Sequence, residues 1–565
     1  MHTRPIRTFR LSPGTVSGTV TGAVHRRRLG AAGVAVLVAL ATVVSLGVAP
    51  ATAAPTARGG QADRPSPRQQ AEATLDAARA LFASGPQPAG APSAAAAPLS
   101  ARTGDTAPPS TVTDDPTLVL RDLALAIPAL RGTDQRQARR ILARPSDPKA
   151  SDSWGATATR RGKKSCTPRF CVHWTTVGDN APPLRGSKRD GVPKQVERTI
   201  SVFRDVWNTE IGKMGFRAPK QDRGGSIDNR DPRFDIYLSD LGRGFYGYCA
   251  PDDKRVVRQA AYCVVDDDFS PAQFPVHTPL QNLQVTAAHE FNHAVQFNYD
   301  ITEDAWIMEA TSTWIEDEVY DAVNDNRQYL DVSNYRQPEI PLDYGRSPTW
   351  YGNWIFLRSL TEDHGADLVR RLWNRLAATS TRDLGDFSTQ GLQDTLAGYG
   401  DSLPDAYARF AAKNQTPGTE YTEGAAYRKA PFGAQVVRIG AGGSVSPGSS
   451  MDHLTSVAIK VIPGPSLTPA DQVTFDVSGL TQGKGGRLIV VVTPASGDPA
   501  ITVPQDPGTP FTLPVSDTVS WTVVVTNGSW QVKRSSCYSR STRFACGGAR
   551  TINDDLAVTV KVTSP

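Results

Sequence analysis

Residues 283–297 read Leu-Gln-Val-Thr-Ala-Ala-His-Glu-Phe-Asn-His-Ala-Val-Gln-Phe and carry the pattern His-Glu-x-x-His at His289, Glu290 and His293. The stretch contains no Gly or Pro, so we predict a helix. Residues four apart lie on one face of a helix, so both imidazoles can point at one metal ion while Glu290 reaches a water bound to it. Chance would produce this pattern in roughly 0.5% of such chains. The pattern therefore favours a metal site over a surface helix that happens to carry two histidines.

A third ligand is expected because a zinc ion that does chemistry has three protein ligands and keeps the fourth position for water. The segment Trp306-Ile-Met-Glu-Ala-Thr-Ser-Thr-Trp-Ile-Glu-Asp has helical spacing, and its Glu309 lies sixteen residues after His293. That gap allows one helix to end, turn over residues 299–304 and return antiparallel. A metzincin would carry histidine ten residues after His289, where this chain has Tyr299. We therefore predict Glu309 as the third ligand.

His-Glu-x-x-His followed by Trp-x-x-Glu-Ala resembles the gluzincin metallopeptidases. Glu309, with Glu316 seven residues later, is similar to the second glutamate-bearing helix of the aminopeptidase branch of that clan. A wider likeness to secreted bacterial members covers about residues 172–365. It rests on Asp190-Gly-Val-Pro, Phe234-Asp-Ile-Tyr-Leu with Tyr246-Gly-Tyr, and Tyr351-Gly-Asn-Trp-Ile-Phe-Leu before His364-Gly365.

The resemblance implies a catalytic zinc ion held by His289, His293 and Glu309, with Glu290 as the general base of peptide-bond hydrolysis. Glu290 would take a proton from water and pass it to the leaving amine. The developing oxyanion then needs a hydrogen-bond donor. Tyr351 is the first candidate by its likeness to the downstream tyrosine of the aminopeptidase branch, and Tyr344 is the second. A tyrosine packed in the core is the alternative for either.

One position departs from the thermolysin pattern. Four residues after Glu309 that branch carries an aspartate that orients a zinc-bound histidine, and this chain has Thr313. Thr313, Glu316 or Asp317 could take this role, and the sequence leaves the choice open.

The acidic run Asp266-Asp267-Asp268 is a candidate Ca²⁺ site, and a solvated loop is its alternative. The net charge of +5 comes from the N-terminus, because residues 1–53 contain six arginines and no acid. The remainder is close to neutral, so nothing in the charge indicates a nucleic-acid partner.

The N-terminus reads as an export signal. Arg26, Arg27 and Arg28 precede the apolar run 29–48, and Ala51-Thr52-Ala53 is a small-x-small cleavage site. We predict a signal peptide over 1–53 and no membrane attachment after its cleavage; an uncleaved signal anchor is the alternative. Export favours disulfides, so the six cysteines are expected to pair locally as Cys166 with Cys171, Cys249 with Cys263 and Cys537 with Cys546.

Residues 54–150 are predicted to be a prosegment or linker, largely disordered or helical. Two helical patterns, 69–83 and 117–142, flank a Pro/Ala-rich stretch over 85–109. In the second pattern the apolar residues Leu120, Leu123, Ile127 and Leu130 could pack on a partner surface. A disordered tether is the alternative.

Residues 151–431 are expected to form an α+β zincin-like metallopeptidase domain, because predicted strands precede a long helical region over about 283–411. The helix 194–214 and the half-buried strand 234–238 belong to its first part. That strand could be the edge on which a peptide substrate pairs, or an ordinary interior strand. Residues 432–565 carry regularly spaced β-rich runs and are predicted to be an all-β sandwich.

Taken together, these features predict a secreted zinc metallopeptidase that acts on peptides or proteins. Its prosegment would keep it inactive, and its β-sandwich would dock to substrate or cell wall. One alternative is a secreted or cell-surface binding protein with a structural or relict zinc site. Another is a zinc hydrolase that acts on a non-peptide amide or ester.

Overall fold

The computed structural model describes residues 66–83, 115–184, 191–221, 231–242, 245–252, 257–345, 348–380, 385–431, 435–502, 505–531 and 553–565. The predicted signal peptide 1–53, the stretch 85–109 and the Cys537–Cys546 pair lie outside these ranges. All described residues belong to one unit, Arg64–Pro565. Among the described helices, none combines the length and the apolar composition needed to cross a membrane.

The first sheet has five strands in the order β1-β2-β3-β5-β4. They are β1 (Lys163–Cys166), β2 (Phe170–Trp174), β3 (Phe234–Ser239), β4 (Gly247–Pro251) and β5 (Ala261–Asp266). The three inner strands run parallel, and β1 and β4 pair antiparallel at the two edges. The disulfides Cys166–Cys171 and Cys249–Cys263 tie each edge strand to its neighbour. Two of the three predicted pairings are therefore confirmed.

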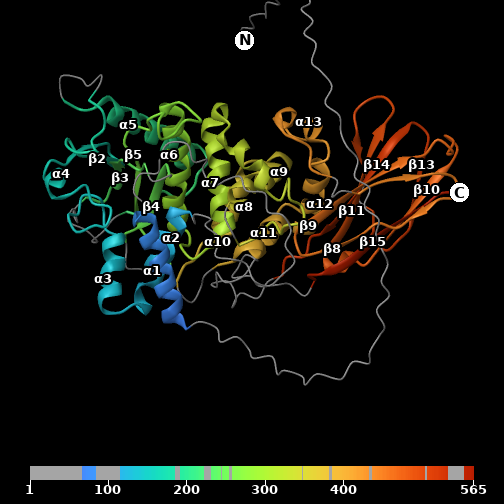
Figure 1. Ribbon diagram of the computed structural model, residues 1–565, viewed down its shortest axis with the longest axis horizontal. Helices are drawn as coiled ribbons and strands as arrows, with labels where there is room; N and C mark the ends of the chain where they lie inside the picture. The colour runs from blue at the N-terminus through green and yellow to red at the C-terminus, as the bar shows by residue number, and fades with distance from the viewer. Residues whose placement is uncertain are drawn as a thin grey trace, which may run out of the picture. The chain divides into compact units, whose positions relative to one another are not determined.

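Helices cover both faces of this sheet (Figure 1). On β3, Ile236 and Leu238 pack in one hydrophobic cluster, and Tyr237 between them packs in another. The first cluster includes α5 (Lys194–Trp207), α6 (Pro279–Phe297) and α7 (Ala305–Tyr320). The second includes α1 (Pro67–Ala83), α2 (Pro116–Ala126) and α3 (Gly132–Ile141).

The position of β3 corrects two predictions about residues 234–238. All six residues of β3 are buried, so the strand is not half-buried as its alternation suggested. Helices on both faces explain the difference, since each set of alternating side chains meets a core. Moreover, β3 lies between β2 and β5 and has no free edge, so the prediction that a peptide pairs on this strand is wrong. Among the described strands, β4 forms the edge of the sheet next to β5.

The helices predicted around the Pro/Ala-rich stretch are present. The pattern over 69–83 becomes α1, and that over 117–142 becomes α2, a short 3₁₀ turn (Ile127–Ala129) and α3. The break falls between Pro128 and Gly132, whose φ of +55° favours glycine. The apolar residues Leu120, Leu123 and Leu130 are buried in the cluster that contains sheet tyrosines, so these helices are not a disordered tether.

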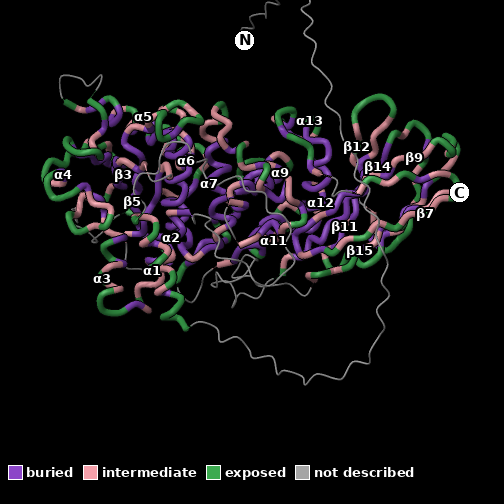
Figure 2. The backbone as a smooth tube through the Cα atoms, in the orientation of Figure 1, coloured by how far each residue is buried: buried purple, intermediate pink, exposed green. Residues whose placement is uncertain are grey.

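The two central helices form as the sequence predicts, with wider bounds. Thr278 caps α6 through a capping box with Gln281, and Pro279 occupies its first turn. After the loop 298–304, α7 returns beside α6. Figure 2 shows both helices buried for most of their length. They are core helices, so polar side chains on them need partners inside the protein.

Further helices follow over the predicted helical region, with short segments elsewhere. The helix predicted over 194–214 is α5 continued by a π-helix (Asn208–Lys213). The other α-helices are α4 (Ala156–Arg160), α8 (Thr349–Gly352), α9 (Trp354–His364), α10 (Asp367–Leu376), α11 (Ser388–Ala397), α12 (Leu403–Lys413) and α13 (Pro417–Glu420). The remaining 3₁₀ turns are Asp321–Val323, Asp325–Val332, Gly424–Ala426 and Gln482–Lys484.

The C-terminal part contains two five-stranded sheets. One comprises β7 (Ser444–Val445), β8 (Gly448–Met451), β10 (Gln472–Ser478), β13 (Phe511–Pro514) and β15 (Leu556–Thr563). The other comprises β6 (Val436–Ile439), β9 (Thr455–Pro463), β11 (Gly486–Pro494), β12 (Ala500–Ile501) and β14 (Thr518–Asn527). Phe475 of the first sheet and Trp521 of the second share one hydrophobic cluster. The other face of the second sheet packs on α12 through Ala408 and Ala411. The chain is therefore a mixed α and β structure, as predicted.

Candidate metal centre

Three side chains from α6 and α7 converge in the core. His289 and His293 project from α6, and Glu309 projects from α7. Glu309 Oε2 lies 3.1 Å from His289 Nε2, and Glu309 Oε1 lies 3.4 Å from His293 Nε2. One nitrogen or oxygen from each residue lies within 4.8 Å of the others. The structure thus brings together the three predicted metal ligands, which we call the His–His–Glu cluster.

The cluster fits a tetrahedral zinc ion. Bonds of about 2.0–2.1 Å in tetrahedral geometry separate neighbouring ligand atoms by about 3.3 Å, and each imidazole Nε2 lies at a similar distance from one of the two Glu309 oxygens. His293 Nε2 and Glu309 Oε1 are buried and have no hydrogen-bond partner. Buried polar atoms are normally satisfied, and a cation shared by these two atoms, which lie 3.4 Å apart, would satisfy both. Two imidazole nitrogens and one carboxylate oxygen are a donor set that suits zinc.

The second ring nitrogen of each histidine has its own acceptor. His289 Nδ1 lies 2.6 Å from Glu316 Oε1, and His293 Nδ1 lies 2.9 Å from Gln296 Oε1. These contacts direct both Nε2 atoms toward Glu309. Of the three residues left open by the sequence, Glu316 is the one that contacts a histidine. Thr313 Oγ1 has no hydrogen-bond partner and Asp317 pairs with Arg358. Gln296 was missed, although it stands three residues after His293 on the same helix.

The carboxyl groups of Glu309 and Glu290 differ strongly in pKa. Burial alone would raise the pKa of Glu309, but the charge of His293 and the hydrogen-bonded, positively polarised His289 lower it to about 2. Glu309 is therefore ionised, as a metal ligand must be. Burial raises the pKa of Glu290 to about 7; the imidazoles oppose this rise and Asp115 adds to it. A carboxyl with a pKa near neutrality suits proton transfer in both directions.

The side chain of Glu290, on α6, lies next to the edge strand β4. A side chain at Gly247 of β4 would place its Cβ 3.0 Å from Glu290 Cγ and 2.8 Å from Thr286 Cγ2. Glycine at this position therefore allows the strand to pass close to the predicted base. Glu290 itself is only 5% exposed.

Tyr351 lies against the cluster. Its ring stacks on the His289 ring, with centroids 5.6 Å apart, and on the Tyr329 ring, with centroids 5.1 Å apart. The bonds described for Tyr344 are made by its backbone, whose N–H donates to the Pro341 carbonyl at 2.9 Å and whose carbonyl accepts from Trp350 Nε1 at 2.7 Å. The structure thus favours Tyr351 over Tyr344 as a residue of the site. Tyr329 was missed by the sequence analysis.

Asp115 and Thr117, at the start of α2, also reach the site and were not expected there. The Tyr351 hydroxyl donates to Asp115 Oδ2 at 2.6 Å, and Thr117 Oγ1 donates to Glu290 Oε2 at 2.9 Å. Asp115 and Tyr351 are 236 positions apart in the chain, and Thr117 and Glu290 are 173 positions apart. No local sequence pattern could have predicted these contacts.

A buried polar layer supports α6 from below the cluster. Asn292, inside the His-Glu-x-x-His pattern, donates through Nδ2 to Glu210 Oε1 at 2.7 Å. Glu210 belongs to the π-helix, and burial raises its pKa to about 8, so it is largely protonated at neutral pH. Asn292 Oδ1 also accepts from Ser312 Oγ of α7 at 3.1 Å. These bonds fix α6 against its neighbours.

Two of the three aspartates predicted as a Ca²⁺ site, Asp266 and Asp267, come together with a third aspartate that was not predicted, Asp240. Carboxylate oxygens of Asp240, Asp266 and Asp267 lie within 4.8 Å of one another, whereas Asp268 caps the backbone of Ser270. Asp266 accepts backbone hydrogen bonds from Leu241 and Phe269. These bonds also give the Asp266 carboxylate a structural role in the loop.

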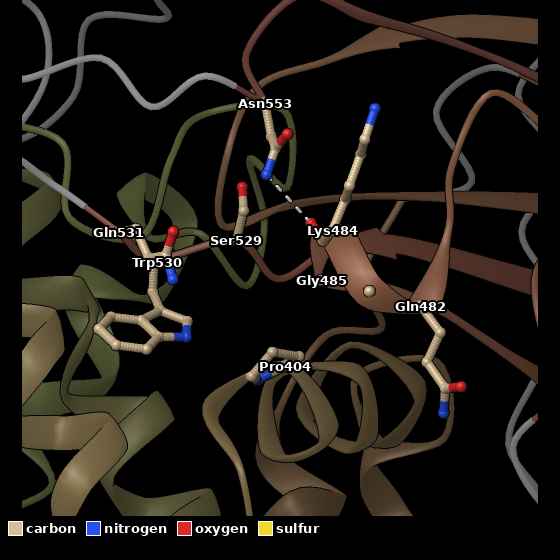
Figure 3. A pocket seen from close by; sticks show the side chains of 9 residues that line it. Pro404, Gln482, Lys484, Gly485, Ser529, Trp530, Gln531 and Asn553 are labelled. Carbon is tan, nitrogen blue, oxygen red and sulfur yellow. Dashed lines mark hydrogen bonds between the residues drawn. The ribbon is translucent and has the colours of Figure 1, made fainter.

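A pocket elsewhere lacks a catalytic constellation (Figure 3). Its charged lining residue is Lys484, whose carbonyl accepts a hydrogen bond from Asn553 Nδ2 at 3.3 Å. The lining residues are Pro404, Gln482, Gly483, Lys484, Gly485, Ser529, Trp530, Gln531 and Asn553. This pocket therefore offers no alternative to the His–His–Glu cluster as the candidate site.

The comparisons with known proteins do not assign an activity to this chain. A family described as "Family of unknown function (DUF6055)" matches residues 144–399, a range that contains the whole His–His–Glu cluster. No curated protein matches the chain. Among solved structures, a periplasmic inhibitor of g-type lysozyme, PliG from Aeromonas hydrophila, is 9% identical and covers 23% of this chain and 96% of its own, with a TM-score of 0.15. A de novo designed double-stranded β-helix is 11% identical and covers 21% of this chain and 99% of its own, with a TM-score of 0.11. Neither likeness bears on fold or function at these scores.

Proposed function

We propose that this chain is a zinc-dependent metallopeptidase. The observation that carries the proposal is the convergence of His289, His293 and Glu309, with two of their buried atoms lacking any other partner. The resemblance of the two helices to gluzincins points to the same metal and to peptide-bond hydrolysis. The sheet followed by helices supports a zincin-like fold for residues 151–431.

Four side chains of the protein would act together with the ion in the proposed reaction. When bound, zinc would supply a Lewis acid that polarises a carbonyl group and makes water more acidic. Glu290 accepts the proton of the attacking water and later delivers it to the leaving amine, a transfer that its pKa near 7 suits. Tyr351 donates a hydrogen bond to the developing oxyanion. Glu316 and Gln296 hold the two imidazoles in the orientation that binds the ion.

The edge strand β4 provides the surface for an extended peptide. Its position at the edge of the described sheet and its close approach to Glu290 at Gly247 support this placement. An edge strand offers backbone donors and acceptors that are independent of side-chain sequence. The substrate class is therefore a peptide or protein in extended conformation.

The N- and C-terminal parts suit an exported preproprotein. Two disulfides are compatible with an oxidising compartment and with the predicted signal peptide. The two C-terminal sheets with a shared core support the predicted β-sandwich. We assign that part to docking on substrate or cell wall, and co-sedimentation of the full chain with insoluble cell-wall material tests this role; a chain that stays in the supernatant would count against it.

The proposed activity is tested by a Glu290→Gln variant and a diverse peptide mixture read by mass spectrometry. The wild-type chain, freed of its prosegment, should cleave peptides, while the variant should lose about 10²–10⁴-fold in rate and keep its zinc content. Equal cleavage by both proteins would contradict the role of Glu290. Zinc binding without cleavage of any peptide would favour the binding-protein alternative, and cleavage confined to other amides or esters would favour the second.

A further inference from the structure

The start of α2 is fastened to the proposed catalytic tyrosine. Asp115 is the N-cap of this helix, and Oδ1 of its carboxylate accepts from the Leu118 backbone N–H at 2.8 Å. The other oxygen, Oδ2, accepts from the Tyr351 hydroxyl at 2.6 Å. One carboxylate therefore both starts the helix and engages the hydroxyl that the reaction needs as an oxyanion donor.

Thr117 engages two more groups of the proposed site. Its hydroxyl accepts from the backbone N–H of Cys249 on β4 at 2.9 Å and donates to Glu290 Oε2 at 2.9 Å. The first is an edge-strand donor that an extended substrate would use. The second is the oxygen of the predicted base. The Thr117 hydroxyl thus binds both the backbone N–H of Cys249 on β4 and the carboxylate of the predicted base, Glu290.

The Asp115 carboxylate is also buried beside the His–His–Glu cluster. It is 6% exposed, and its charge is repelled by Glu309 and attracted by His293. A carboxylate taken out of water next to a second carboxylate is unfavourable unless a cation lies nearby. A divalent ion in the cluster would remove this penalty and hold Asp115 in place.

Packing along α2 keeps its first turn against the site. Leu118 is buried in the cluster of α5–α7, and Leu120 and Leu123 are buried in the cluster on the opposite face of the sheet. Arg121 donates through Nη1 to the backbone carbonyl of Glu303 at 2.9 Å, just before α7. Asp115 and Thr117 are therefore held at the site by the packing and hydrogen bonding of α2.

We propose that Asp115 and Thr117 form an intramolecular inhibitor that occupies the substrate position over the His–His–Glu cluster. This inference rests on the proposed function and specifies how the site is regulated. Tyr351 and Glu290 both have their reactive atoms engaged, and a peptide cannot reach Glu290 while the start of α2 stays in place. Activation requires α2 to be displaced or removed.

The test uses the full-length zinc-loaded chain and a small peptide hydroxamate, which chelates zinc and has an extended backbone. Isothermal titration gives its affinity for the wild type, Asp115→Asn, Thr117→Val and the double variant. Asparagine caps helices as well as aspartate does, so Asp115→Asn removes the charge and keeps the start of α2. Asp76→Asn, on the exposed side of α1, is the matched control.

We expect each single variant to bind the hydroxamate at least about tenfold more tightly than the wild type, and the double variant more tightly still. The control should match the wild type. If zinc is bound at one ion per chain but no variant gains affinity, the inhibitor role is wrong and the proposed function stands. Weaker hydroxamate binding by Asp115→Asn would make Asp115 part of the working site and would also overturn the role. Absence of zinc from every chain would reject the proposed function and this inference with it. Should Asp115→Asn fail to fold, Thr117→Val alone decides.

Discussion

The zinc affinity of the proposed site should depend on side chains that do not touch the metal position. Glu316 accepts from His289, and its carboxylate makes the opposite ring nitrogen a better ligand. Gln296 does the same for His293 without a charge. A neutral acceptor fixes the ring but adds less basicity, so the two histidines are held with unequal strength.

Replacing Glu316 should therefore weaken zinc binding without unfolding the chain. We expect Glu316→Gln to lower the affinity about tenfold, because the amide still accepts a hydrogen bond, and Glu316→Ala to lower it about 100-fold. Competition with a fluorescent zinc chelator measures both. Glu318→Ala is the control, since Glu318 stands two residues later on α7 and pairs with Arg358 instead of a histidine. Equal affinities for all four proteins would remove Glu316 from the metal site.

At the scale of elements, β4 is the strand that joins the sheet to the site. It places Gly247 beside Glu290 and donates the N–H of Cys249 to Thr117, and among the described strands its one neighbour is β5. The Cys249–Cys263 disulfide adds a covalent link between β4 and β5 at directly opposed residues.

Removal of this disulfide should cost more stability than removal of the other described one. The loops closed by Cys249–Cys263 and Cys166–Cys171 span sequence separations of 14 and 5 residues. Loop-closure entropy then predicts losses of about 3 and about 2 kcal/mol in the free energy of unfolding. Urea denaturation of the two Cys→Ala pairs compares them directly. A larger loss for the Cys166–Cys171 pair would show that chain entropy does not set the order.

Which elements the sequence predicts follows from the range of the interactions involved. The ligands on α6 and α7 were predictable because a spacing of four on one helix and a short return to the next are local constraints. Five longer C-terminal strands were predictable for the same reason, whereas β6, β7, β8, β12 and β13 are too short for a period to show. Asp115, Thr117 and Tyr329 were missed because only tertiary packing brings them to the site. The error at β3 arose because alternation alone does not reveal that helices cover both faces.

At the scale of the whole molecule, a buried triad links distant parts of the chain. His453 Nε2 lies 2.9 Å from Asp343, shortly before α8, and its Nδ1 lies 2.8 Å from Asp554, just before β15. The side chain of His453 is fully buried. Although burial lowers the pKa of His453, the two aspartates outweigh it and raise the value to about 10. The triad therefore holds a buried imidazolium at neutral pH.

Stability should consequently fall at alkaline pH. The raised pKa means that the contribution of His453 is complete below about pH 6.5, the ordinary value, and is lost as pH rises through about 10. His453→Ala should cost about 3–5 kcal/mol at pH 7, since it leaves two buried carboxylates without their cation. The melting temperature of the wild type should drop more between pH 7 and pH 10 than that of His453→Gln. Parallel curves for the two proteins would show that the triad does not carry the charge.

The proposed zinc site is tested most directly by X-ray absorption at the zinc edge on the purified full-length chain. We expect one zinc ion per chain with two imidazole nitrogens and a carboxylate oxygen at about 2.0–2.1 Å, and loss of this spectrum in Glu309→Ala. A chain that binds no zinc, or whose zinc spectrum is unchanged by Glu309→Ala, would contradict the proposed centre.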